Sequence, residues 1–143
     1  KVDLSLPQWK CVKYMDKTGS KLNVDLSTIP NKSGGLYLFA IKCDIIPGIT
    51  EFQVYIGRAQ RTDGQNLRKR CKEYYQKYAR TNERPLIKKM FKYWSTNLVL
   101  YYLPLPNNHD IINYEIDLIN KLLLPFNTEI PDKKTKQATL AFP

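Results

Sequence analysis

GLYLFAI (residues 35–41) and FQVYI (residues 52–56) are the two stretches that decide the fold. The first is an apolar run too short for a buried helix, and it lies between Gly34 and the pair Pro47-Gly48, so it suits a buried strand. The second stretch ends at a glycine and faces the first across the loop that contains Pro47 and Gly48. An antiparallel pair is the simplest arrangement of two such strands.

Three helices and a third strand are predicted after this pair. They are a helix from about Gln65 to Ala79 with Asp63 as its N-cap, a helix from Pro85 to about Tyr93, a strand over Asn97–Leu103, and a helix that starts near Asp110 and stops before Pro125. The order strand, strand, helix, helix, strand, helix predicts a small α/β sandwich of the α+β kind.

The length of 143 residues fits one domain, and no repeat, low-complexity tract or linker divides it. We therefore expect a single domain over residues 1–143, with an N-terminal arm (1–33), a core (34–127) and a C-terminal tail (128–143). The arm is expected to form a short strand or an irregular segment. The tail is basic and then apolar, which favours packing back onto the domain.

The charge of the chain indicates a polyanionic partner. Lys and Arg number 23 against 13 Asp and Glu, which gives a formal net charge of +10. This balance is expected of a protein that binds nucleic acid. On charge alone, a basic surface that serves solubility is an equal alternative, so individual residues must decide.

The cysteines indicate an intracellular, cytoplasmic location. There are three of them, widely spaced and without a CxxC pair, and the chain has one histidine. This argues against a disulfide framework and against a structural zinc site, and favours reduced cysteines in the core. No apolar run approaches the length needed to cross a bilayer, so no membrane partner is expected.

Glu115 breaks the pattern of the last predicted helix, because it falls at the centre of a broad apolar arc. The opposite arc already provides a solvent face, so the carboxylate is expected to be buried against a partner. Burying an unpaired carboxylate costs several kcal/mol. The partner is either a buried arginine or a divalent metal ion. Arg70 raises a similar question, since it lies between Leu67 and Tyr74 at the edge of an apolar arc, and a half-buried basic side chain without a ligand is the alternative.

Four ordered elements of the sequence resemble the GIY-YIG nuclease family. They are Gly35-Leu36-Tyr37, then Tyr55-Ile56-Gly57, then Leu67, Arg70 and Tyr74 at helical spacing, and finally Glu115 followed by Asn127. The match covers Gly35 to Asn127 in the order of the family. A single tripeptide would be a chance match, whereas four elements in order are specific.

The resemblance implies a small three-stranded antiparallel sheet flanked by helices and an endonuclease that hydrolyses phosphodiester bonds in nucleic acid, with DNA as the favoured substrate. It also implies one divalent cation, Mg²⁺ or another such as Mn²⁺, bound by Glu115. Arg70 would bind the scissile phosphate. Tyr37 would be the general base, with Tyr74 as its hydrogen-bonding partner or proton relay and Tyr55 positioning water or phosphate. A free phenol has a pKa near 10, so this role requires Arg70 and the metal to lower that of Tyr37.

Three further residues are expected to bind substrate: Arg58, Lys69 and Asn127. Arg58 follows the second motif, where a small residue is common in the family, and the segment between the two tyrosines is longer than in compact members. Both departures are expected to alter contact with the substrate. Tyr74 stands where many relatives have histidine.

Several alternatives stay open at the level of sequence. A catalytically inactive nucleic-acid-binding module of the same fold is the main one, although such a module has no need of a carboxylate beside a phosphate. Restriction, homing, repair and defence roles are all compatible with the motifs. A flanking domain or a homo-oligomer is compatible with them as well.

Overall fold

A computed structural model describes residues 4–5, 8–43, 51–80 and 83–127. The strands are β1 (Lys10–Lys13), β2 (Gly34–Lys42), β3 (Glu51–Ala59) and β4 (Leu98–Leu105), the helices are α1 (Leu67–Ala79), α2 (Pro85–Trp94) and α3 (Asn108–Leu122), and two 3-10 segments are η2 (Val24–Thr28) and η3 (Ser95–Asn97). These elements confirm the predicted mixture of an antiparallel sheet and helices. The loop over residues 44–50 and the tail over residues 128–143 lie outside the described residues.

The sheet has four strands in the order β1-β4-β2-β3, and every neighbouring pair is antiparallel. The predicted β2–β3 pair is confirmed, with Tyr37 opposite Gly57. The prediction of three strands is wrong, because β1 adds to the outer side of β4. The burial of Lys10–Lys13 explains the error: three of these four residues are exposed, so no alternation of apolar and polar residues marks the strand.

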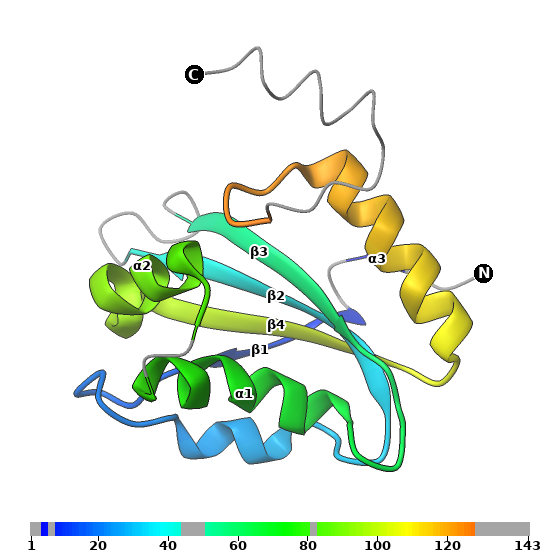
Figure 1. The fold of residues 1–143 in the computed structure, drawn as a ribbon, viewed down its shortest axis with the longest axis horizontal. Coiled ribbons are helices and arrows are strands. Elements are labelled where there is room, and N and C mark those ends of the chain that lie inside the picture. The colour runs from blue at the N-terminus through cyan, green and yellow to red at the C-terminus, as the bar shows by residue number, and fades with distance from the viewer. Residues whose placement is uncertain (1–3, 6–7, 44–50, 81–82, 128–143) are drawn as a thin grey trace.

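Both faces of the sheet are covered, and β2 supplies side chains to each in alternation. Tyr37 and Phe39 belong to the large core that also contains residues of α1 and α2. Leu36 and Leu38 belong to the two clusters that contain residues of α3. Figure 1 shows α1 and α3 on opposite sides of the sheet. A strand buried on both faces reads as a continuous apolar run, which is the pattern of residues 35–41.

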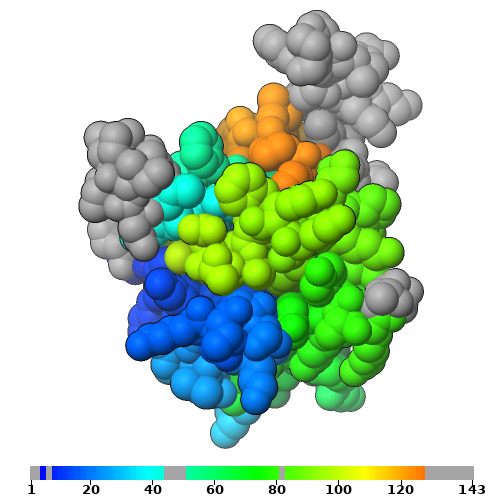
Figure 2. Space-filling view, turned by 90° about the vertical axis from the view of Figure 1, so that its left-hand side faces the viewer, coloured from blue at the N-terminus to red at the C-terminus, as the bar shows by residue number. Residues whose placement is uncertain are grey.

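The segment expected to be an arm contributes to the large core. Tyr14 is fully buried, its hydroxyl donates to the carbonyl oxygen of Cys71 at 2.6 Å, and its ring meets that of Phe39 edge-on at 4.9 Å. Tyr75 of α1 donates in turn to the carbonyl oxygen of Ser20 at 2.7 Å. Figure 2 shows this N-terminal segment in blue against α1 in green and α2 in yellow-green. The segment therefore fixes α1 on the sheet.

The predicted helix limits are correct to within two residues, and side-chain caps explain where α1 and α3 begin. The N-cap of α1 is Asn66 rather than Asp63, because the Asn66 side chain accepts from the backbone N–H of Lys69 at 2.9 Å. Asn107 caps α3 in the same way, so α3 begins at Asn108. These caps place Arg70 in the first turn of α1 and Glu115 in the second turn of α3.

Strand β4 continues past the predicted end at Leu103 to Leu105. The last residue of β4 that pairs with β1 is Tyr102, so only β2 adjoins β4 at Pro104. A proline lacks a backbone N–H and is tolerated where a strand has a free side.

The outer edge of β3 is closed by residues that follow α3. The backbone N–H of Phe126 donates to the carbonyl oxygen of Val54 at 2.9 Å. The side-chain amide of Asn127 accepts from the N–H of Ile56 and donates to its carbonyl oxygen, both at 2.8 Å. These bonds satisfy backbone groups that an edge strand otherwise leaves exposed. Asn127 thus behaves as one residue of an additional strand.

Replacing Asn127 by Ala is expected to lower the free energy of unfolding by about 2 kcal/mol, since it removes two hydrogen bonds to one backbone residue. Chemical denaturation measures the effect. Asn113→Ala is the matched control, because Asn113 is exposed on α3 and its side-chain amide hydrogen-bonds to exposed His109 one turn earlier. Equal stability of the two variants would contradict the structural role of Asn127.

Candidate active site

A cavity of about 440 Å³ gathers most of the residues selected from the sequence. It is lined by Tyr37, Tyr55, Arg58, Ala59, Gln60, Thr62, Gln65, Arg70 and Glu115. These residues come from β2, β3, the segment after β3, α1 and α3. Tyr37 and Tyr55 lie on the face of the sheet covered by α1, whereas α3 packs on the other face. Because β3 is an edge strand, the cavity can reach around it to both faces.

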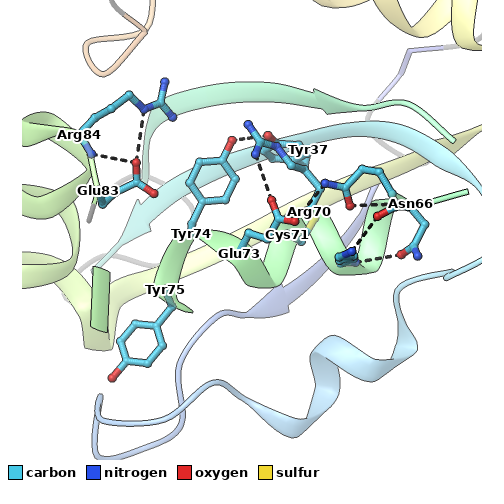
Figure 3. A network of polar contacts seen from close by, with 12 residues as sticks. Tyr37, Asn66, Arg70, Cys71, Glu73, Tyr74, Tyr75, Glu83 and Arg84 are labelled. Carbon is cyan, nitrogen blue, oxygen red and sulfur yellow. Dashed lines mark hydrogen bonds and ion pairs between the residues drawn. The ribbon is translucent and has the colours of Figure 1, made fainter. Parts of the chain in front are cut away.

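Three tyrosine hydroxyls form a chain beside this cavity. The hydroxyls of Tyr37 and Tyr74 are hydrogen-bonded to each other, and that of Tyr74 donates to that of Tyr55 at 3.5 Å. All three side chains are buried. Figure 3 shows the Tyr74 ring rising from α1 with its hydroxyl toward Tyr37. Tyr74 does not line the cavity itself, so it links two phenols that do.

Gly57 makes room for the Tyr37 ring. The two residues are cross-strand partners, and a Cβ atom on Gly57 would lie 2.5 Å from Cζ of Tyr37. That distance is far inside van der Waals contact, and the ring is buried and rigidly held by Phe39 and Tyr74. The glycine at this position therefore allows the phenol to lie across β3 and reach Tyr74.

Arg70 projects from the first turn of α1 into the same cavity. Its guanidinium forms an ion pair with Glu73 at 3.1 Å and lies 5.2 Å from the centre of the Tyr74 ring. The Arg70 side chain is 30% exposed to solvent. A partly exposed guanidinium held by a carboxylate and by an aromatic ring is oriented in advance for an anion such as phosphate.

Burial governs the ionisation of the phenols. Burial raises the pKa of Tyr37, and the positive charge of Arg70 offsets this only in part. Burial also raises the pKa of Tyr74 well above its usual value. Both phenols are therefore neutral near pH 7. The role of general base required Arg70 and the metal to lower the pKa of Tyr37; Arg70 does act in that direction, but burial outweighs its effect and the pKa is raised.

Glu115 has a cationic partner, as its position predicted, although that partner is partly exposed rather than buried. Its carboxylate accepts from the guanidinium of Arg58 at 2.5 Å, and its side chain is 12% exposed. Of the two alternatives left open by the sequence, an arginine is the partner present. Burial raises the pKa of Glu115, while Arg58 and Arg70 lower it in part. The ionised form of this carboxylate is thus less favourable in the folded protein than in water.

A divalent cation would fit this carboxylate only with ligands from elsewhere. Within the described residues, no group of three or more His, Cys, Asp or Glu side chains is placed to hold a metal ion. Glu115 is the one carboxylate among the residues that line the cavity. Mg²⁺ commonly takes one or two carboxylates and completes its shell with water and substrate phosphates. The donor set is therefore compatible with a cation shared between Glu115 and a phosphate.

Two of the expected substrate-binding residues lie away from the cavity. Lys69 donates to the carbonyl oxygen of Gly64 at 2.7 Å and lines a separate hollow on α1 with other basic and amide side chains. The Asn127 amide is occupied by Ile56 at the β3 edge. Arg58, the third such residue, lines the cavity.

The sequence did not indicate Arg84, which precedes α2. Its guanidinium donates to the Tyr55 hydroxyl at 3.1 Å and lies 5.2 Å from the centre of that ring. It also lines a smaller hollow of about 210 Å³ together with Arg70 and Tyr74. Gln60, Thr62 and Gln65 were missed as well. These are polar residues of loops and of a helix start, where no local periodicity marks a functional position.

Comparisons of the chain with protein-family models, with curated proteins and with solved structures give no match. None of the helices among the described residues is long and apolar enough to span a membrane. The assignment of a function therefore rests on the residues that meet at the cavity.

The raised pKa of Glu115 has a consequence for stability. Because the folded-state pKa exceeds the unfolded value of 4.5, the protonated carboxyl stabilises the fold below that pH, and this contribution is lost as the pH rises through the folded pKa. Replacing Glu115 by Gln should therefore raise the free energy of unfolding at pH 7 and make little difference at pH 4.

Urea denaturation at both pH values measures this difference. Asp117→Asn is the matched control on the same helix, since Asp117 is 54% exposed and pairs with Lys121. A Glu115→Gln variant that is less stable than the unchanged protein at pH 7 would show that the ion pair with Arg58 outweighs burial.

Proposed function

We propose that this protein is a metal-dependent endonuclease of the GIY-YIG type that hydrolyses phosphodiester bonds in nucleic acid, with DNA as the expected substrate. One observation carries the proposal: Tyr37, Tyr55, Arg70 and Glu115 line a single cavity. They lie on four different elements. They are also the residues to which the resemblance assigns the chemistry. A core that served only the fold would not need a carboxylate, an arginine and two phenols around one cavity.

The charge of the cavity suits a phosphodiester. Arg58 and Arg70 oppose the single carboxylate of Glu115 among the lining residues. Hydrolysis places additional negative charge on the phosphoryl oxygens, and preorganised donors that face this charge stabilise the transition state. The fork of the Arg70 guanidinium provides such donors from a side chain already held by Glu73 and Tyr74.

Glu115 would hold a divalent cation, which when bound polarises the phosphate and stabilises the departing 3′ oxygen. The position of the carboxylate supports this role, since its α3 backbone is fixed and its side chain is mostly buried beside the cavity. The substrate phosphate would complete the ligand set that the described residues leave incomplete.

The phenol chain provides a route for the proton of the attacking water. Tyr37 would accept this proton as it passes its own to Tyr74, Tyr74 would pass its proton to Tyr55, and Tyr55 would protonate the departing 3′ oxygen. Both ends of the chain line the cavity. Each phenol is protonated before and after the transfer, so no phenolate has to be present at rest. This suits the raised pKa of Tyr37 and Tyr74.

Arg84 supports the direction of this transfer. The Tyr55 oxygen accepts from Arg84 at 3.1 Å and from Tyr74 at 3.5 Å. With both donors on its oxygen, the Tyr55 proton is left to point toward the cavity.

Cleavage tests the proposed function directly. Purified protein is incubated with supercoiled plasmid, single-stranded DNA and RNA, in Mg²⁺ or in EDTA. We expect cleavage only in Mg²⁺, and a fall of about 10²–10³-fold in Glu115→Gln, the size of effect seen when one group that stabilises transition-state charge is removed. Asp117→Asn should cleave normally, since Asp117 is exposed and pairs with Lys121.

Tight binding of nucleic acid without cleavage in any metal would favour the inactive binding module. The specific observation in favour of that alternative is the completed ion pair between Arg58 and Glu115.

Replacing Tyr37 by Phe removes the hydroxyl that would receive the proton while keeping the ring packed on Gly57. We expect kcat to fall by about 10²-fold, as for the loss of a general base, with substrate affinity nearly unchanged. Tyr93→Phe is the matched control, because Tyr93 is 62% exposed. Single-turnover kinetics and anisotropy of labelled DNA separate the two effects, and full turnover by Tyr37→Phe would dispose of its role.

A further inference from the structure

Arg58 is bonded to the one carboxylate of the cavity lining. The distance from its guanidinium to the Glu115 carboxylate oxygen is 2.5 Å. The two side chains differ in exposure to solvent, with 36% for Arg58 and 12% for Glu115. Glu115 is therefore held in place, while Arg58 retains a face toward solvent. The guanidinium occupies one of the two oxygens of the carboxylate, and its positive charge opposes a divalent cation on the same group.

The second arginine of the cavity differs in this respect. Arg70 has its own carboxylate, Glu73, and lies against the ring of Tyr74. The guanidinium of Arg58 pairs with Glu115 and with no second carboxylate among the described residues. Of the two cavity arginines, Arg58 is thus the one whose release would expose Glu115.

Like charges oppose a cation at Glu115 whenever no phosphate offsets the two cavity arginines. A divalent ion on the carboxylate would lie near two guanidinium groups, and both repel it. A phosphodiester reverses this balance, because its anionic oxygens attract the guanidinium fork and can themselves bind the cation. The cation is thus favoured only when the phosphate is present.

We propose that Arg58 couples the binding of a divalent cation to that of a phosphodiester: it holds Glu115 until a phosphate group takes up its guanidinium, and the carboxylate is then free to bind the cation. This inference rests on the proposed function and adds an order of events to it. In the absence of nucleic acid the cation binds weakly, which limits loading of the site without substrate. By linkage, the cation and the phosphodiester strengthen each other's binding by the same factor.

The test is a titration with Mn²⁺ in the absence of nucleic acid, followed by electron paramagnetic resonance of the free ion. Arg58→Gln should bind Mn²⁺ more tightly than the unchanged protein by about 5- to 150-fold, the usual range of coupling between two sites. Arg61→Gln removes the same charge from an exposed side chain that donates to the Lys32 carbonyl oxygen, and it should bind Mn²⁺ as the unchanged protein does. The double variant Arg58→Gln/Glu115→Gln should lose the gain.

Equal Mn²⁺ affinity of Arg58→Gln and the unchanged protein would overturn the inference, as would an equal gain in Arg61→Gln. A second measurement needs no variant at Arg58: Mn²⁺ should raise the affinity of the unchanged protein for a fluorescent phosphorothioate DNA, and no such rise would also overturn it. Neither readout depends on cleavage. An active nuclease without the gain therefore refutes the coupling alone, whereas an inactive protein with the gain refutes the nuclease alone.

Discussion

The close pairing of β2 with β3 is the constraint on which the site depends. Their register sets Tyr37 opposite Gly57, and the absence of a side chain there lets the phenol cross β3 and meet Tyr74. Side chains alternate along a strand, so a slip of one residue would turn Tyr37 to the face of α3 and bring Leu36 beneath α1. The same register sets Arg58 opposite Leu36, on the α3 face. One strand pair therefore positions groups that belong to both faces.

The edge position of β3 explains how these groups meet. In the interior of a sheet, neighbouring strands would separate Tyr37 and Tyr55 from Glu115 on α3. At β3 no further strand intervenes, so a single cavity includes all three side chains. A different part of the same edge is closed by Asn127, which satisfies the backbone of Ile56. One part of the β3 edge is thus protected from pairing with other chains, and another part adjoins the polar side chains of the cavity.

The parts of this structure that local pattern determines could be predicted from the sequence. The apolar run of residues 35–41 identified an inner strand of the sheet, and the position of Glu115 within an apolar arc predicted a cationic partner, which proves to be partly exposed. The identity of that partner could not be predicted, because Arg58 lies 57 residues away on β3 and meets Glu115 only once α3 packs on that face of the sheet. The pairing of β1 with β4 and the contact of Arg84 with Tyr55 were missed for a similar reason, since both are long-range and leave no periodic signal.

The free-energy cost of burying the ionised Glu115 carboxylate helps to decide whether this residue serves the fold or a function. An ion pair whose carboxylate is mostly buried contributes little net stability, because desolvation offsets the attraction of the two charges, and an apolar pair of similar size commonly serves the fold as well. The raised pKa of Glu115 shows that Arg58 does not fully offset the burial of the carboxylate. A carboxylate that is unfavourable to the fold, beside a cavity with two arginines and two phenols around it, is consistent with the proposed role of that cavity. Since anionic phosphate suits the arginines and a cation suits the carboxylate, the two ligands together satisfy groups that neither satisfies alone.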